Sequence, residues 1–162
     1  MVHMTPPRAL VVDNNTSLAA TVGELLAESG FEVEVVASGV DALVVWRRQP
    51  ADLVVVDVDL PDIGGLTLAR RLLRRAAGCK LLVMSAGESQ GLLDLCEELG
   101  VAFLAKPFSA ARLAAMVRRM AEHAAGASQP GACGVARAER APLCARGPRA
   151  LLPQHGRPSR GG

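Results

Sequence analysis

Aromatic residues are scarce in this sequence. Its 162 residues include three phenylalanines, one tryptophan and no tyrosine, although 50% of all residues are apolar. A hydrophobic core must therefore consist mainly of leucine, valine and alanine, which suits helices packed on a parallel sheet better than an aromatic-rich β-sandwich. The length accommodates one ordinary domain with an additional segment.

Membrane, secretion and metal-site patterns are also missing. No apolar run approaches the roughly 20 residues that a membrane-spanning helix requires. No apolar stretch typical of a signal peptide occurs at residues 1–5. The cysteines form neither a CxxC motif nor the Cys and His spacing of metal sites. We therefore predict a soluble cytoplasmic protein with reduced thiols and no membrane partner. The cysteines are Cys79, Cys96, Cys133 and Cys144.

Charge is unevenly distributed along the chain. Residues 1–123 contain 12 lysines and arginines against 15 aspartates and glutamates, a net charge of −3. Residues 124–162 contain six arginines against the single acid Glu139, a net charge of +5. This second segment has no periodic apolar pattern, so it cannot bury enough apolar surface to offset the entropy cost of ordering. We predict a disordered tail over residues 124–162 and a disordered N-terminus over residues 1–7.

Apolar runs and helical repeats alternate five times between these two ends. The clearest run is LVVVD at residues 53–57, which has the composition of a buried parallel strand. Ser38 is suited to cap a helix, and Gly30 and Gly100 are suited to end one. The predicted strands are 9–12, 31–36, 53–57, 81–84 and 101–105, and the predicted helices begin near residues 15, 38, 66, 90 and 109.

Five such units predict an α/β fold, the flavodoxin-like doubly wound (βα)5 arrangement. We expect a five-stranded parallel sheet in the order 2-1-3-4-5 with helices on both faces. Strands 1 and 3 are then neighbours where the winding reverses, and ligands bind outside the carboxyl ends of strands at such a point. Asp13 and Asp57 follow those two strands, so we expect them to face each other. For Asp13, a cap of the following helix is the alternative interpretation.

Polar residues also follow the two remaining strands. Ser85 follows strand 81–84, and Lys106 follows strand 101–105. The whole pattern resembles the receiver domain of two-component response regulators, the chemotaxis regulators among them. The resemblance covers residues 8–122, and we assign a receiver domain to residues 8–123. The motifs that carry it are VVD at 11–13, VVVDVDLPDIGG at 54–65, MSA at 84–86 and KPF at 106–108.

The resemblance implies that Asp57 accepts a phosphoryl group from a sensor histidine kinase or a phosphotransfer protein. It implies Mg²⁺ or another divalent cation as cofactor, held by Asp13, Asp57 and the backbone carbonyl of Asp59. Asn14 stands where the family most often has a second acidic ligand. The amide oxygen of Asn14 can still bind Mg²⁺, but it carries no negative charge, so we predict weaker metal binding than in a typical receiver. Such a domain is a signalling protein, and it catalyses only its own phosphoryl transfer and dephosphorylation.

The resemblance also implies how the phosphoryl group is sensed. Lys106 pairs with the phosphoryl oxygens, Ser85 donates a hydrogen bond to them, and the ring of Phe103 moves with that hydroxyl. The Lys106–Pro107 peptide bond is expected to be cis. The surface of residues 90–122 is expected to respond to phosphorylation and to bind a downstream protein or a second copy.

Two other functions stay open, in descending rank. A receiver whose site has decayed, beginning at Asn14, would act as an interaction module without phosphorylation. The basic tail would bind nucleic acid by neutralising phosphates. The scarcity of aromatics, the low charge density and the lack of a helix-turn-helix pattern speak against nucleic acid. The arginines at positions 70, 71, 74 and 75 are interpreted as a solvated helix face.

Overall fold

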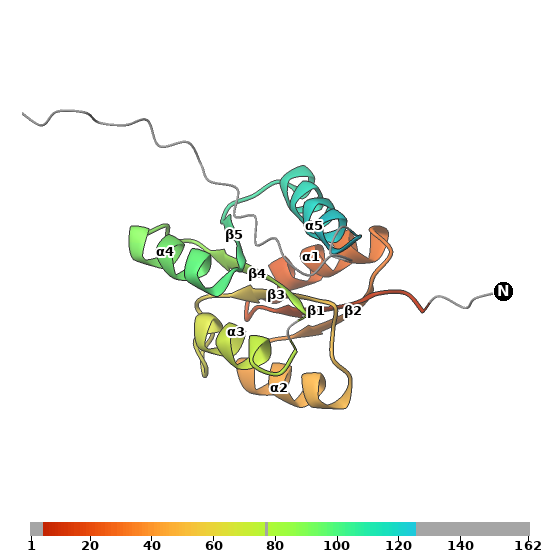
Figure 1. The fold of residues 1–162 in the computed structure, drawn as a ribbon, viewed down its shortest axis with the longest axis horizontal. Helices are drawn as coiled ribbons and strands as arrows, with labels where there is room; N and C mark the ends of the chain where they lie inside the picture. The colour runs from red at the N-terminus through yellow and green to blue at the C-terminus, as the bar shows by residue number, and fades with distance from the viewer. Residues whose placement is uncertain (1–4, 77, 126–162) are drawn as a thin grey trace, which may run out of the picture. The chain divides into compact units, whose positions relative to one another are not determined.

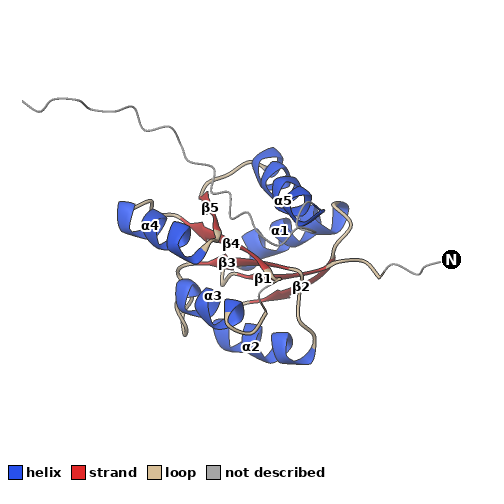
Figure 2. Ribbon diagram, viewed as in Figure 1, coloured by secondary structure: helices blue, strands red, loops and turns tan. Residues whose placement is uncertain are grey.

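Five strands and five helices alternate along the part of the chain that the structure covers. The computed structural model describes residues 5–76 and 78–125 (Figures 1 and 2). The elements are β1 (Arg8–Val12), α1 (Thr16–Glu28), β2 (Glu32–Val36), α2 (Gly39–Arg48), β3 (Leu53–Asp57), α3 (Gly65–Leu73), β4 (Lys80–Ser85), α4 (Gln90–Leu99), β5 (Ala102–Ala105) and α5 (Ala110–Ala125).

The strands form one parallel sheet in the order β2-β1-β3-β4-β5. This order confirms the prediction of a doubly wound, flavodoxin-like fold. Val12 at the end of β1 pairs with Val36 on one side and with Val56 on the other. In the next pair of strands, Asp57 is aligned with Met84. The carboxyl ends of β1, β3 and β4 therefore lie together at one edge of the sheet.

The sheet lies between two layers of helices (Figure 2). Helices α1 and α5 pack on one face, and α2, α3 and α4 pack on the other. Leu53 and Val55 of β3 pack with the first layer, whereas Val54 and Val56 pack with the second. All five residues of β3 are buried, which confirms the buried parallel strand predicted for residues 53–57. The core consists largely of leucine, valine and alanine, as the composition predicted.

Short polar residues and glycines delimit the helices. The side chains of Asn15, Ser38 and Ser89 accept hydrogen bonds from the first turns of α1, α2 and α4. Gly100 ends α4 with a φ of 66°, in the left-handed region that favours glycine. The cap predicted at Ser38 and the stop predicted at Gly100 are both confirmed.

Helix α5 extends slightly beyond the predicted end of the domain. Helix α5 continues to Ala125, so Ala124 and Ala125 belong to a helix and not to the predicted tail. The rest of that tail and residues 1–4 lie outside the described residues. Among the helices that the structure describes, none is long and apolar enough to cross a bilayer.

Candidate functional site

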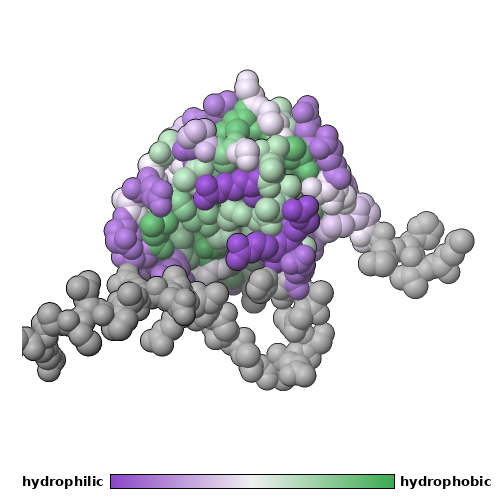
Figure 3. Space-filling view, turned by 90° about the horizontal axis from the view of Figure 1, so that it is seen from above, coloured by the Kyte–Doolittle hydropathy of each residue, from purple (hydrophilic) through white to green (hydrophobic). Residues whose placement is uncertain are grey.

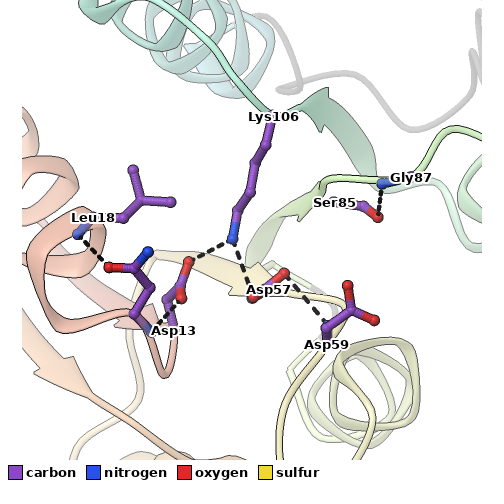
Figure 4. Close-up of polar contacts among 8 residues, drawn as sticks. Asp13, Leu18, Asp57, Asp59, Ser85, Gly87 and Lys106 are labelled. Atoms are coloured by element: carbon purple, nitrogen blue, oxygen red, sulfur yellow. Dashed lines mark hydrogen bonds and ion pairs between the residues drawn. The ribbon is translucent and has the colours of Figure 1, made fainter.

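Two buried carboxylates share one ammonium group at the carboxyl edge of the sheet. The Nζ atom of Lys106 lies 2.8 Å from Oδ2 of Asp13 and 3.0 Å from Oδ2 of Asp57. Figure 4 shows the lysine side chain reaching between the two acids. Asp13 is 1% exposed and Asp57 5% exposed, so water screens this arrangement poorly. The structure thus brings together three residues that the sequence placed at separate strand ends.

Asp13 is oriented by the segment that follows it. Its Oδ1 atom accepts a hydrogen bond of 2.8 Å from the backbone N–H of Asn15. Asn15 in turn caps α1, because its side-chain oxygen accepts from the N–H of Leu18 at 3.2 Å. The cap of α1 is therefore Asn15, and the alternative interpretation of Asp13 as that cap is wrong. The second carboxylate oxygen of Asp13 is directed to Lys106 instead.

The two oxygens of Asp57 have unequal partners. Oδ2 is held by Lys106, whereas Oδ1 accepts only a long contact of 3.4 Å from the N–H of Asp59. A carboxylate is ionised at neutral pH and requires no general base to act as a nucleophile. The weakly bonded Oδ1 is the oxygen of Asp57 best suited to attack an electrophile.

Lys106 is held as a cation by its two partners. Burial alone lowers the pKa of its ammonium, but the hydrogen bonds from it to Asp13 and Asp57 and the charges of both acids outweigh burial and raise the pKa above its ordinary value. The backbone of Lys106 is anchored as well, because its N–H donates to the carbonyl of Ser85 at 2.7 Å. The Lys106–Pro107 bond is cis, as predicted. The site therefore has a permanent positive charge beside Asp57.

Ser85 lies at the end of β4, the strand next to Asp57. Its side chain is buried, and its Oγ accepts a hydrogen bond of 3.1 Å from the N–H of Gly87 (Figure 4). Phe103 is half-buried and packs against the core on the α2, α3 and α4 side of the sheet. The Oγ–H of Ser85 has no acceptor assigned in the described residues, so the hydroxyl is available to an arriving anion.

The donors near Asp57 suit a small hard cation. Asp13 and Asp57 offer carboxylate oxygens, and Asn14 and Asp59 are exposed residues of the adjoining loops. Within residues 5–76 and 78–125, no group of three or more His, Cys, Asp or Glu side chains is arranged to hold a metal. Two carboxylates are nevertheless enough for Mg²⁺, which keeps several waters and uses one or two carboxylates. The residues present therefore fit the predicted cofactor.

Gly65 and Asp62 were not recognised as important in the sequence. A Cβ atom on Gly65 would lie 1.9 Å from the carbonyl oxygen of Asp57, so only glycine fits where α3 starts. The carboxylate of Asp62 accepts hydrogen bonds from the N–H groups of Gly39 at 2.9 Å and Val40 at 2.7 Å. Asp62 thus ties the loop after Asp57 to the start of α2. In the sequence, the pair of glycines after Pro61 is the signal that could have indicated this close approach. The pair does not show which of the two positions must be glycine.

A family profile described as the response regulator receiver domain matches residues 9–118. The chain belongs to the response regulator receiver domain family. Receiver domains are signalling domains of two-component systems, and this receiver has the fold and the strand order expected of one.

Curated relatives of this receiver differ in length. It is 34% identical over 111 residues to the transcriptional regulatory protein CreB of Escherichia coli, covering 68% of this chain and 48% of CreB. It is 28% identical over 108 residues to the chemotaxis protein CheY of Bacillus subtilis, covering 65% of this chain and 90% of CheY. The chain therefore spans about half the length of CreB and most of the length of CheY.

Solved structures show the same fold. The receiver domain protein (CheY-like) from Methanospirillum hungatei superimposes with a TM-score of 0.70 at 22% identity, covering 75% of this chain and 99% of that one. The BeF3-activated DrrB receiver domain superimposes with a TM-score of 0.67 at 25% identity, covering 73% of this chain and 99% of that one.

Proposed function

We propose that this receiver accepts a phosphoryl group on Asp57 from a phosphohistidine of a sensor histidine kinase or phosphotransfer protein. The observation that carries the proposal is the position of Asp57, buried at the strand edge with Lys106 on one oxygen and the other oxygen weakly bonded. Oδ1 attacks phosphorus while the bond from phosphorus to the imidazole nitrogen breaks, and its electron pair stays on the imidazole. An acyl phosphate on Asp57 results.

Charge neutralisation is the main contribution of the surrounding residues. The transferred group carries negative charge on its oxygens throughout the reaction, and fixed cations stabilise that charge. Lys106 is the resident cation, since its ammonium already contacts Asp57 at 3.0 Å. A divalent cation bound by Asp13, Asp57, the carbonyl of Asp59 and the amide oxygen of Asn14 would neutralise further phosphoryl charge.

In this proposal, the side chains of Ser85 and Phe103 respond to the phosphoryl group. The Ser85 hydroxyl donates to a phosphoryl oxygen, which requires its side chain to turn from its present contact with Gly87. Phe103 lies in β5 between the core and a groove of about 320 Å³ that Met116 and Met120 of α5 also line. We propose that the Phe103 ring moves together with Ser85 and thereby changes the surface near α5.

The responding surface is residues 90–122, which contain α4, β5 and α5. Figure 3 views the molecule from above Figure 1, the side on which α5 lies, and shows apolar groups gathered between charged ones. A surface of this kind suits a protein partner. We propose a downstream protein or a second copy as its ligand, and the cytoplasm as the location of the receiver.

The test is the mass of the intact full-length chain after incubation with Mg²⁺ and acetyl phosphate or phosphoramidate. We expect one phosphoryl adduct, absent from Asp57→Ala and present in the matched variant Glu88→Ala, which removes an exposed carboxylate from another loop. An adduct that persists in Asp57→Ala would place the acceptor elsewhere.

A receiver that works without phosphorylation is the alternative outcome of the same experiment. Asn14 favours it, because one anionic ligand is missing from the expected metal site. The absence of any adduct from the wild-type chain with either donor would support the alternative. Nucleic-acid binding through residues 124–162 is not proposed, since that segment lies outside the described residues apart from the end of α5.

A further inference from the structure

Helix α3 presents a dense row of positive charge. Arg70, Arg71, Arg74 and Arg75 are all exposed, and none forms an ion pair with another residue that the structure describes. Arg70 and Arg71 lie in the last turn of α3, and Arg74 and Arg75 directly follow its end at Leu73. The exposure predicted for these arginines is confirmed, although two of them lie beyond the helix, and solvation alone does not explain why four cations gather there.

Helix α4 presents the opposite charge. Asp94, Glu97 and Glu98 are exposed, and no ion pair engages them within residues 5–76 and 78–125. Asp94 accepts a hydrogen bond of 2.7 Å from the side chain of Gln90. Glu97 and Glu98 lie in the last turn, where no basic residue is present and where acids oppose the helix dipole. The stability of α4 itself therefore does not account for these acids.

The two helices belong to the same layer of the fold. Both α3 and α4 pack on the face of the sheet that α2 also covers. A groove of about 510 Å³ is lined by residues of both helices, with Leu66 of α3 and Leu92 and Leu95 of α4 contributing apolar groups. Asp59 and Ser85 of the candidate site line the same groove, which is therefore of mixed polarity. The layer thus combines exposed arginines at the end of α3, this groove and exposed acids on α4.

We propose that this α3–α4 face binds the α3–α4 face of a second copy about a twofold axis. A twofold contact requires a surface that is complementary to itself. Rotation by half a turn places the arginines of α3 opposite the acids of α4 in the partner, and the acids of α4 opposite the partner's arginines. Each ion pair is formed twice, and the leucines of the groove contribute apolar contact area.

The same charges argue against other occupants. Nucleic acid and anionic membranes would be attracted to α3 but repelled by the three acids of α4 on the same face. An acidic protein would meet the same repulsion. A second copy satisfies both helices at once, so the charge pattern favours it. The contact shares α4 with the proposed output surface of residues 90–122, but it also requires α3.

Sedimentation of the full-length chain over a range of concentrations tests the proposal. We expect a reversible dimer whose dissociation constant rises roughly tenfold between about 0.05 and 0.5 M NaCl, since the Debye length shortens about threefold. Arg70→Glu with Arg74→Glu, and separately Glu97→Arg with Glu98→Arg, should each abolish the dimer. An equimolar mixture of the two variants should restore it, because both contacts are then complementary again.

A matched pair on α2 provides the control. Arg47→Glu with Arg48→Glu makes the same charge change on exposed residues of another helix and should leave the dimer intact. Circular dichroism confirms that each variant is folded, and a single chain carrying all four α3 and α4 changes should dimerise. A wild-type monomer at every concentration, or a dimer that survives either variant alone, overturns the proposal.

Discussion

The carbonyl oxygen of Asp57 lies 1.9 Å from the point where a Cβ atom on Gly65 would stand. Helix α3 begins at Gly65, and its N–H donates to the carbonyl of Val58 at 3.0 Å. The chain thus leaves β3, turns through the loop and returns so closely that only a residue without a side chain fits. The backbone of Asp57 and the start of α3 are held together by this contact.

Gly65→Ala should therefore destabilise the receiver. The added methyl group forces the start of α3 away from β3, and we expect the free energy of unfolding to fall by about 2–3 kcal/mol. Urea denaturation followed by circular dichroism measures it. Gly64→Ala is the matched control, because no atom lies within 4 Å of its Cβ position, and its effect should stay within about 0.5 kcal/mol. Equal losses in the two variants would contradict this explanation.

Asn14→Asp should strengthen binding of Mg²⁺. Asn14 is exposed at the end of β1, next to the buried Asp13, and a carboxylate there adds a negative charge to the proposed metal site. We expect roughly tenfold tighter binding in an isothermal titration, because affinity for hard cations rises with ligand charge.

Asn15→Asp is the control for this metal titration. It adds the same charge one residue further on, where an aspartate still caps α1, and its gain in affinity should be smaller. No gain for Asn14→Asp in the native protein would show that the amide does not limit metal binding.

Asp62 should make the stability of the receiver depend on pH in acid. The N–H of Ile63 contributes most to holding the pKa of Asp62 below its ordinary 3.8, and the N–H groups of Gly39 and Val40 add to this effect. A lowered pKa means that the stabilisation is present above pH 3.8 and is lost as the pH falls through the value in the folded protein.

The measurement is urea denaturation of the wild type and of Asp62→Asn at about pH 7 and about pH 3. At about pH 7 the wild type should be more stable than Asp62→Asn, because its carboxylate accepts hydrogen bonds from the N–H groups of both Gly39 and Val40. The difference should shrink in acid. A difference that stays constant across this range would contradict the role assigned to the carboxylate.

Cys79 should resist alkylation in the folded protein. Burial raises the pKa of its thiol to about 12, with the negative charge of Asp52 adding to the effect. At pH 8 the reactive thiolate is then only about 10⁻⁴ of the total. We expect iodoacetamide to modify Cys79 at least roughly 100-fold more slowly in the native chain than in urea, as measured by peptide mass. Equal rates would show that the thiol is not protected.

Much of the fold follows from local patterns in the chain. The LVVVD run at residues 53–57 is fully buried as predicted, since a strand in the middle of a parallel sheet has apolar neighbours on both faces. Right-handed crossovers and the need to cover both faces of the sheet favour the doubly wound order. Element ends were less predictable, as α5 shows by extending to Ala125, two residues beyond the predicted end of the domain at residue 123.

The residues of the candidate site that directly follow strands were predictable from the sequence. Parallel strands place their carboxyl ends at one edge, so Asp13, Asp57, Ser85 and Lys106 had to lie near one another. Only the tertiary structure distinguishes the two interpretations of Asp13, as a helix cap or as a partner of Lys106. Whether a carboxylate caps a helix or turns to a lysine 93 residues away depends on one side-chain direction.

The sequence by itself determined the fold, the strand order and the four polar positions at one edge, because periodicity and parallel topology act through short segments. Only the tertiary structure decided that Lys106 contacts both acids, that Gly65 has no room for a side chain beside Asp57, and that Asp62 binds the start of α2. Each of these contacts joins residues that are distant along the chain or face each other across a loop. Their distances arise from packing of the whole domain, which no local pattern encodes.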